Sequence, residues 1–565
     1  MLTDLASVIT SRTTSSPRRS AKPRLLNGAM PETGHVFVVH ADLTKLACDY
    51  YLIPTDASLD FGRHWRGKFG SPRSDLPVAK VSETDRVTNA RTLHDGARVR
   101  WVDTGSVPDA RSERLGWLED GVRQALSEVE ADLRDVTDGR NRRARPLVGM
   151  PVFGTGAGGY DRIRGEVLDM LLELTHGIAA SASFDVVIVC YDRSDYSALQ
   201  YRRKRLKLSS AALGDEQLKV ADSLGERARA GRLVLFLGAG VSIPAGLPSW
   251  GELIEKLAEA NPNGTINAAK LADMAPPDAA SVLMESSNAE EFSELLSQQL
   301  RRDEHALGHA LLASLRVAEV VTTNFDDLYE QSAAVTFGER KLRVLPWERA
   351  EPGLPWLLKM HGGIDRSHVV FSREDYDRFE TSWGPLRSIV QALLMTRHVL
   401  FVGYSLKDEN FKRLTEEVRD LFKKEAEPSS DNSAPQVLGT IVTLQPEPET
   451  AAQWSPDLDT IAASENCITP DGSGTADAGR KLEIFFDRIA AKAASDEHSY
   501  VLDPRYAELL VDTDRPFAEQ LVKLAHDLPD SHPAWRKVKE LVASYGAPGA
   551  VVLAGDSHQT TTNEH

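Results

Sequence analysis

The sequence predicts an α/β protein with two sheet-containing parts followed by a small helical region. Two observations support this prediction. In two separate parts of the chain, short apolar runs of strand length alternate with runs of helical periodicity. In each part a glycine-rich turn directly follows one of the apolar runs, as occurs where a strand of an open α/β sheet leads into a ligand-binding loop.

The first regular part of the chain begins near residue 35. Apolar runs at residues 35–43, 48–56 and 145–153 are expected to be strands, and a glycine loop follows the third. A helix is expected over residues 164–181 and a further strand over residues 184–192. This alternation predicts an α/β domain.

The second part opens with LVLFLGAGVSIPAGLPSW, residues 233–250. Five apolar residues predict a buried strand, and the segment after the turn predicts a helix start. Gly238 and Gly240 would let the chain approach a phosphate closely, and the helix N-terminus would favour its negative charge. The spacing differs from both common nucleotide-binding glycine patterns, so on its own the turn is also open to a purely structural interpretation.

Three further apolar runs end in small or polar residues. They lie at residues 317–330, 356–365 and 397–411. Because ligands of open α/β sheets bind outside the carboxyl ends of the strands, we expect these segments to border one crevice. The residues at the strand ends are Thr323, Asn324, Asp326, His361, Gly403, Ser405 and Asp408.

The ordered motifs GAGVS, TTNFD, MHG and GYSLKDENF resemble the sirtuin-like NAD-binding family, and most of all its branch in prokaryotic antiphage-defence proteins. The resemblance covers residues 231–489 and implies a Rossmann-like parallel sheet with flanking helices. It implies NAD+ as the substrate and an NAD+ glycohydrolase (NADase) activity. The catalytic residues that it implies are Asn324, His361 and Asp326. The dinucleotide contacts that it implies are Gly238, Ala239, Gly240, Ser242, Thr323, Gly403, Ser405 and Asp408.

The residue types suit cleavage of the nicotinamide–ribose bond. Nicotinamide leaves as a neutral group, so the site needs dipoles for an oxocarbenium-like transition state and a positioned water more than a strong acid. Asn324 can hold a water or the carboxamide, and Asp326 can contact the carboxamide or orient the loop. His361 can accept a proton from a ribose hydroxyl or from the water. Out of this context, such residues are more often turn or structural residues.

Cysteine usage bears on the choice of acceptor. Sirtuin deacylases hold a structural zinc with two Cys-x-x-Cys pairs, whereas this chain has three separated cysteines, Cys48, Cys190 and Cys467. We therefore expect no zinc ribbon and no metal, and water as the acceptor of the ADP-ribosyl group. The alternatives left open are an NAD-dependent protein deacylase or ADP-ribosyltransferase, and a non-catalytic NAD or ADP-ribose sensor that assembles with a partner.

The first part of the chain resembles a macro domain, the ADP-ribose-binding module. The resemblance rests on residues 41–44 and on the glycine loop at residues 154–160. It implies an ADP-ribose-type ligand, although a purely structural domain is an equal alternative. Pro54-Thr55-Asp56 replaces the family's Asn-rich loop, so we do not expect hydrolysis of ADP-ribosyl bonds. The contacts that it implies are Asp42, Gly154, Gly156 and Gly158.

Composition narrows the class of protein and its compartment. Hydrophobic residues make up 41% of the 565 residues and charged residues 26%, as in globular domains. We find no apolar run of spanning length and no signal peptide, and the few cysteines fit a reducing compartment, so we expect a cytoplasmic protein without membrane contact. A net charge of −17 makes binding of bulk nucleic acid unfavourable.

Partners are inferred from the resemblance. Because unregulated NAD+ hydrolysis would poison its own cell, the resemblance implies a gated effector that depletes NAD+ in antiphage defence. The macro-like domain is the expected gate, either by sensing a ligand or by holding an inactive oligomer. We expect a homo-oligomer, with a partner ATPase or a phage-derived trigger as further partners.

Changes in composition along the chain predict the boundaries of its domains, linkers and loops. A polar loop is expected at residues 426–434, another at residues 447–457, and a short helix at residues 2–9. The expected divisions are a flexible segment at 1–33, the macro-like domain at 34–205, a helical linker at 206–230, the sirtuin-like domain at 231–495, a helical region at 496–548 and a disordered tail at 549–565.

Overall fold

Six strands form the first sheet of the computed structural model, in the order β1-β6-β5-β2-β4-β3. Neighbouring strands run parallel, except that the short edge strand β3 pairs antiparallel with β4. The strands are β1 (Val36–His40), β2 (Tyr50–Thr55), β3 (Arg91–Thr92), β4 (Arg98–Asp103), β5 (Leu147–Pro151) and β6 (Asp185–Cys190). The accompanying helices are α1 (Arg66–Phe69), α2 (Arg111–Asp132), α3 (Arg164–Ala179) and α4 (Arg193–Leu206).

Strands β1, β2, β5 and β6 and helix α3 lie where the sequence predicts them. Their apolar runs are continuous because a central strand of a parallel sheet is buried on both faces, as all six residues of β6 are. Strand β4 was not predicted, since Arg98 and Arg100 interrupt its apolar pattern. The Arg100 guanidinium is buried and donates to Asp132 Oδ2 of α2 at 2.9 Å, so a later element neutralises the charge.

The second sheet has seven strands, all parallel, in the order β13-β12-β11-β7-β8-β10-β9. The chain enters this sheet in the middle, at β7, builds one side through β10, and then returns to the other side through β11. Such a reversal leaves a crevice at the carboxyl ends of the central strands. The strands are β7 (Leu233–Leu237), β8 (Glu319–Thr322), β9 (Arg343–Leu345), β10 (Trp356–Lys359), β11 (His398–Val402), β12 (Gly439–Thr443) and β13 (Leu458–Ala462).

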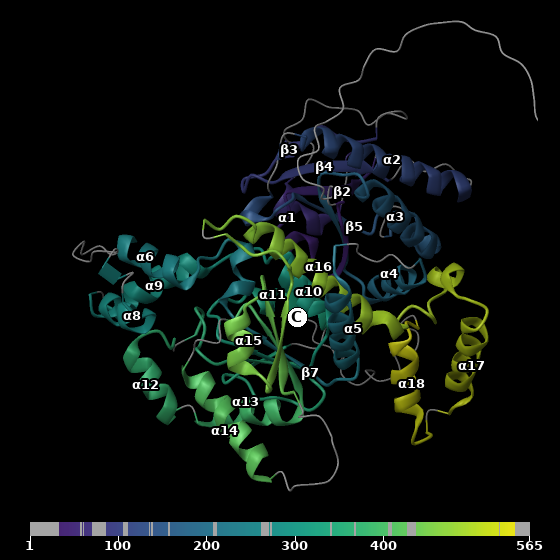
Figure 1. Cartoon of the computed structure of the whole chain (residues 1–565). Helices are drawn as coiled ribbons and strands as arrows, with labels where there is room; N and C mark the ends of the chain where they lie inside the picture. Colours follow the sequence, from purple (N-terminus) through teal and green to yellow (C-terminus); the bar gives the residue numbers. More distant parts are fainter. Residues whose placement is uncertain are drawn as a thin grey trace, which may run out of the picture. The chain divides into compact units, whose positions relative to one another are not determined.

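Helices flank this sheet, as expected for a Rossmann-like fold, and Figure 1 labels them. A mixed, mainly parallel sheet and an all-parallel sheet, each with helices, followed by further helices, confirm the predicted fold class. The helices are α5 (Asp215–Arg229), α6 (Trp250–Ala260), α8 (Pro276–Glu285), α9 (Ala289–Leu300), α10 (Leu307–Ser314), α11 (Leu328–Thr336), α12 (Arg373–Ser382), α13 (Gly384–Thr396), α14 (Glu409–Glu425), α15 (Pro448–Trp454) and α16 (Thr475–Ala493).

The prediction of a polar loop at residues 447–457 was wrong, because helix α15 occupies this segment. Pro448 stands in the first turn, where its fixed φ suits a helix and its missing N–H costs nothing. At the other end Trp454 is 3% exposed and packs near Phe411, with ring centroids 6.0 Å apart. The segment was predicted to be a loop because its composition is mainly polar, although burial of the single residue Trp454 holds the helix in place.

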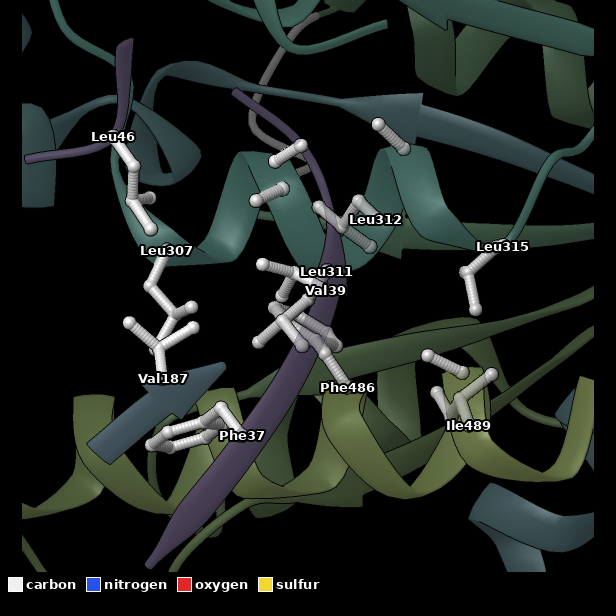
Figure 2. Packing of buried hydrophobic residues seen from close by; sticks show 14 of the residues in the cluster. Phe37, Val39, Leu46, Val187, Leu307, Leu311, Leu312, Leu315, Phe486 and Ile489 are labelled. Atoms are coloured by element: carbon white, nitrogen blue, oxygen red, sulfur yellow. The ribbon is translucent and has the colours of Figure 1, made fainter. Parts of the chain in front are cut away.

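The two sheets share one hydrophobic core. Figure 2 shows Phe37 and Val39 of β1 and Val187 of β6 lying against side chains of α10 and α16. Buried residues of both parts of the chain belong to this single cluster, so burial of the first sheet depends on helices of the second. The residues that Figure 2 labels are Phe37, Val39, Leu46, Val187, Leu307, Leu311, Leu312, Leu315, Phe486 and Ile489.

A row of buried ion pairs joins α16 to the first part of the chain. Arg480 of α16 grips the fully buried Asp185 through two hydrogen bonds of 2.8 and 2.9 Å. Although burial favours a protonated carboxyl, Arg203 and His35 hold the pKa of Asp487 below its ordinary value. The three arginine–carboxylate pairs are Asp185–Arg480, Arg143–Glu483 and Arg203–Asp487.

The C-terminal helices pack with the first sheet rather than with the second. Buried residues of the segment after α16, among them Tyr500, Tyr506 and Val542, share a core with α2, α3 and β6. This region is helical, as predicted, and appears yellow in Figure 1. Its elements are η7 (Ala494–Asp496), η8 (Pro504–Leu509), α17 (Asp514–Asp527) and α18 (Trp535–Ser544).

Several sequence-based expectations fall outside the residues that the structure describes, namely the helix at 2–9, the loop at 426–434 and the tail at 549–565. Among the described residues, no helix combines the length and apolar character needed to span a bilayer. The structure describes residues 33–56, 59, 62–70, 86–104, 111–134, 136, 139–155, 159–206, 212–260, 270–271, 274–286, 288–338, 342–366, 369–382, 384–404, 409–425, 437–469, 471–529 and 531–547.

Replacing Arg480 by Met tests the buried contact between the two sheets. The change leaves Asp185 buried without its two hydrogen bonds from α16, so we expect a loss of about 3–5 kcal/mol in the free energy of unfolding. The matched control is Arg488→Met on the same helix, whose pair with Asp222 is about one-third exposed and worth about 0–1 kcal/mol. Equal losses in chemical denaturation would contradict the assignment.

Candidate functional site

The carboxyl ends of four parallel strands of the second sheet meet at one edge. Thr322, the last residue of β8, is in register with Leu237 of β7 and with Lys359 of β10. Val402, the last residue of β11, is in register with Leu237 from the other side. The predicted site residues follow these strand ends, so the sheet topology brings their backbones to the same edge.

The glycine turn after β7 lies directly against the end of β11. Gly240 N donates to Gly403 O at 2.9 Å, and Gly403 has a φ of +63°. A Cβ on Gly238 would lie 2.4 Å from Gly403 O, and one on Gly240 would lie 2.8 Å from Gly403 Cα. Close packing of two backbones therefore requires glycine here, whatever a bound ligand adds. Ala239, between the two glycines, is exposed.

Asn324 is fixed at the end of β8 by bonds to the glycine turn. Its Nδ2 donates to Gly238 O at 3.1 Å and lies 3.2 Å from Ser242 Oγ, while its backbone N–H donates to Thr322 Oγ1 at 3.0 Å. Since Gly238 O can only accept, the amide is oriented with Oδ1 on the opposite side. Oδ1 is buried and has no partner among the described residues, so it is an acceptor available to a water or a substrate group.

Ser242 and Asp326 complete this network. Ser242 Oγ donates to Asp326 Oδ2 at 3.0 Å, and Leu328 N donates to Asp326 Oδ1 at 3.1 Å. Burial raises the pKa of Asp326, and the nearby Lys359 ammonium opposes this rise. Both carboxylate oxygens thus have protein donors. This geometry favours the loop-orienting role expected for Asp326 over direct contact with the carboxamide.

A histidine that the sequence analysis did not single out borders the same network. His309 of α10 is buried, and its Nε2 lies 3.3 Å from Ser242 Oγ. Because the Ser242 hydroxyl hydrogen goes to Asp326, His309 Nε2 must be the donor. Burial lowers the pKa of His309 to about 3, so the ring is neutral, with Nδ1 unprotonated. A lone histidine in the apolar segment GHALLAS carries no recognisable signal of this role.

His361 lies two residues beyond the end of β10 and is buried. Its ring meets that of Tyr376 on α12 edge-on, with centroids 5.4 Å apart, and its carbonyl accepts from Val370 N at 2.8 Å. Direct contacts join the glycine turn, Asn324 and Asp326, whereas His361 enters from the next strand of the sheet. Thr323 contributes backbone, its N–H donating to Leu237 O at 3.2 Å. Ser405 and Asp408 lie outside the described residues.

The first sheet has a cavity of its own, with a volume of about 870 Å³, at the carboxyl ends of β1, β2, β5 and β6. The predicted ligand residues Asp42 and Gly154 both line it, while Gly156 and Gly158 lie outside the described residues. Asp42 accepts from Thr44 N at 2.8 Å and from Thr44 Oγ1 at 2.7 Å, which fixes the turn after β1. Other lining residues include Thr55, Asp56, Arg63, Arg164, Tyr191 and Asp195.

One wall of this cavity is held by the C-terminal region. Arg164 donates to both oxygens of the buried Asp195 at 2.8 and 2.7 Å, and Tyr506 OH of η8 donates to Asp195 Oδ1 at 2.8 Å. Burial raises the pKa of Asp195 and Arg164 opposes the rise. No pattern in the sequence links residues 164, 195 and 506, so this contact was not predicted.

No group of three or more metal-ligating side chains occurs within the part of the chain that the structure describes. The cysteines are dispersed: Cys48 is buried just before β2, Cys190 is buried at the end of β6, and Cys467 is exposed after β13. Burial raises the pKa of the Cys48 and Cys190 thiols, which keeps them protonated. These thiols therefore act as small apolar core residues.

Residues 318–457 match the family model of the SIR2-like domain. The NAD(+) hydrolase ThsA of Enterococcus faecium is 27% identical over 209 residues, 35% of this chain and 42% of that protein. Defense-associated sirtuin 2 of Bacillus subtilis is 24% identical over 241 residues, 40% of this chain and 23% of that protein. The chain thus matches less than half of the length of these relatives. It carries a SIR2-like domain related to theirs, which confirms the resemblance.

Among solved structures, the chain is similar to the Oceanobacillus iheyensis macrodomain. A mutant of this macrodomain with ADPR is 17% identical to this chain. The match spans 30% of this chain and 92% of the macrodomain chain, with a TM-score of 0.22. The macrodomain with ADP is 16% identical, and its match spans 30% of this chain and 90% of the macrodomain chain, with a TM-score of 0.24.

Buried neutral histidines make stability sensitive to acid. Burial lowers the pKa of His309 to about 3 and that of His305 to about 4, against about 6.5 in an unfolded chain. Below pH 6.5 the unfolded state therefore binds more protons, and each histidine lowers the free energy of unfolding by up to about 1.4 kcal/mol per pH unit. We expect a smaller loss of Tm between pH 7 and pH 5 for His309→Gln than for the wild type. The exposed His526→Gln serves as the control, and an equal loss in all three proteins would contradict this prediction.

Proposed function

We propose that this chain is an NAD+ hydrolase that releases nicotinamide and ADP-ribose. The observation that carries the proposal is the buried Oδ1 of Asn324, an acceptor without a partner among the described residues, in a network with Ser242 and Asp326. An unpaired buried acceptor is costly, so it persists where a ligand or a water completes it. The relationship to proteins named NAD(+) hydrolase supports the choice of substrate.

The chemistry follows from the residue types. The bond between the ribose C1′ and the nicotinamide nitrogen breaks, and its electron pair leaves with nicotinamide as a neutral molecule. The ribosyl carbon then takes an oxygen from water, and the water proton passes to a base. Asn324 Oδ1 would orient that water, His361 would accept the proton from it or from a ribose hydroxyl, and Asp326 would hold the loop.

Water is the acceptor favoured by the sequence. Only three cysteines occur in the chain, too few for the four-thiolate zinc site that sirtuin deacylases carry. The reaction products distinguish water from a protein as the acceptor. Hydrolysis yields free ADP-ribose without any added acceptor, whereas a deacylase or an ADP-ribosyltransferase requires a protein substrate. The name of the Bacillus subtilis relative, defense-associated sirtuin 2, supports a role in defence. We propose that this role is antiphage defence, which depletion of NAD+ would serve.

Helix α10 provides a physical connection by which the first part of the chain would gate the site. Ala47 N donates to His305 O at 3.0 Å, and His305 N donates to Lys45 O at 2.8 Å, so the turn after β1 is paired to the start of α10. At the other end of α10, His40 N donates to Ser314 Oγ at 3.0 Å.

The same turn and the same helix each reach one of the two sites. The residues just before Lys45, including Asp42, line the cavity of the first sheet. On α10, His309 contacts Ser242 of the glycine turn. If a ligand enters the cavity and moves the turn after β1, the movement would pass through α10 to His309 and displace Ser242, which is hydrogen-bonded to Asn324. We expect an ADP-ribose-type compound to be this ligand, and a homo-oligomer to be the gated form.

Variants of Asn324 and His361 test the catalytic assignment. Asn324→Ala removes the orienting amide and His361→Gln removes the base, so we expect each to lower nicotinamide release by at least about 100-fold. Thermal melts within a few degrees of the wild type would show that the fold is kept. Turnover unchanged in both variants would refute the site, and no free ADP-ribose from an active wild type would refute hydrolysis.

Asp42 tests the gate, with ADP-ribose as the probe. In the wild-type protein, we expect added ADP-ribose to change the rate of nicotinamide release several-fold. In Asp42→Ala, the ratio of the rates with and without ADP-ribose is expected to fall to about one, whereas the exposed control Asp527→Ala should keep the wild-type ratio. A wild-type rate that is already maximal and indifferent to ADP-ribose would contradict the gate.

A further inference from the structure

Lys359, the last residue of β10, carries a buried ammonium group next to the Asn324 loop, which comprises residues 323–327 between β8 and α11. Its side chain is 4% exposed. Nζ donates to Asp326 O at 2.5 Å, lies 3.4 Å from Phe325 O, and donates to Glu330 Oε1 of α11 at 2.8 Å. An ammonium group has three N–H donors, and these three acceptors account for all of them.

A charge at this position needs a reason, because the rest of the strand is apolar. Leu357 and Leu358 precede Lys359, and both are fully buried. A third apolar side chain would fill the same space without the cost of desolvating an ammonium. An apolar side chain, however, would leave the carbonyl of Asp326 without its donor and the carbonyl of Phe325 with only its backbone donor, Ile364 N. These carbonyls belong to the two residues that directly follow Asn324.

The loop after β10 rests on the same lysine. Ile364 N donates to Phe325 O at 3.0 Å, so the loop that carries His361 is hydrogen-bonded to the loop that carries Asn324. A Cβ on Gly363 would lie 3.3 Å from Lys359 Cε and 3.4 Å from Nζ, which places the lysine stem directly under this second loop. One side chain therefore supports the backbone of both.

We propose that Lys359 is a positioning residue of the NAD site, which fixes the Asn324 loop relative to the His361 loop through the carbonyls of Phe325 and Asp326. This inference rests on the proposed function, because it concerns the alignment of those two side chains on NAD+. Because protein acceptors use all three donors of Nζ, Lys359 would act through these loops and not by contact with the substrate. The Glu330 carboxylate balances the charge of the Lys359 ammonium and accepts a hydrogen bond from Nζ, which keeps Nζ close to the Asp326 carbonyl.

The first test compares Lys359→Met with the wild type in steady-state nicotinamide release. Methionine keeps the length of the stem and removes the charge. Misalignment of the two loops should lower kcat at least about tenfold and change KM less than about threefold. Lys256→Met on the exposed face of α6 is the matched control and should keep the wild-type kcat. A kcat of Lys359→Met within twofold of the wild type would overturn the proposal.

A double variant separates positioning from simple structural support. Lys359→Met alone leaves the Glu330 carboxylate without its partner, and the resulting loss of stability could lower activity indirectly. Adding Glu330→Leu removes that unpaired charge, so we expect the Tm to recover toward the wild-type value. The Asp326 carbonyl still lacks its donor and the Phe325 carbonyl its contact with the ammonium, so kcat should stay low. Recovery of kcat together with Tm would overturn the proposal.

Hydrogen exchange gives a readout that does not depend on catalysis. In the double variant, amides of residues 323–328 and 360–364 should exchange at least about tenfold faster than in the wild type, while those of β12 stay unchanged. If the wild type releases no nicotinamide, the proposed function fails, and the exchange experiment alone decides the role of Lys359. Unchanged exchange in both loops would overturn it.

Discussion

Helix α16 is the element on which the arrangement of the chain depends. One side of this helix contributes Phe485, Phe486 and Ile489 to a core that both sheets share, and another side presents Arg480, Glu483 and Asp487 to charged partners from the first part of the chain. Apolar burial supplies most of the driving force, whereas buried ion pairs are costly unless every partner is placed. The ion pairs therefore fix the register of the helix against the first sheet.

This contact explains why two α/β sheets form one unit. Helix α10 lies in the same core as α16, and its hydrogen bonds reach the turn after β1 at one end and the glycine turn after β7 along its length. The contact with the turn that borders the cavity of the first sheet lies at His305, and the contact with the candidate NAD site lies at His309, about one helical turn further along the chain. Regulation of one site by the other needs no flexible linker in such an arrangement.

Much of the fold could be predicted from periodicity, because buried parallel strands are continuous apolar runs and their glycine turns are conspicuous. The exceptions have a common cause, which is that each depends on a partner far away in the sequence. Strand β4 carries Arg100, whose carboxylate partners lie on α2, and α15 depends on the burial of the single residue Trp454.

The candidate site divides in the same way. Gly238, Ser242, Asn324 and His361 could be found because each follows a strand in a recognisable order. His309 and Lys359 could not, since only the folded chain shows that His309 contacts the glycine turn and that Lys359 contacts the loop after β8.

The contact of Tyr506 with Asp195 has a further consequence for biosynthesis. The wall of the first cavity lacks this contact until residue 506 has left the ribosome, and the core behind β7 lacks α16 until residue 493 has done so. A nascent chain with a finished glycine turn and Asn324 loop therefore still lacks the helix that completes the core behind the strand that carries this turn.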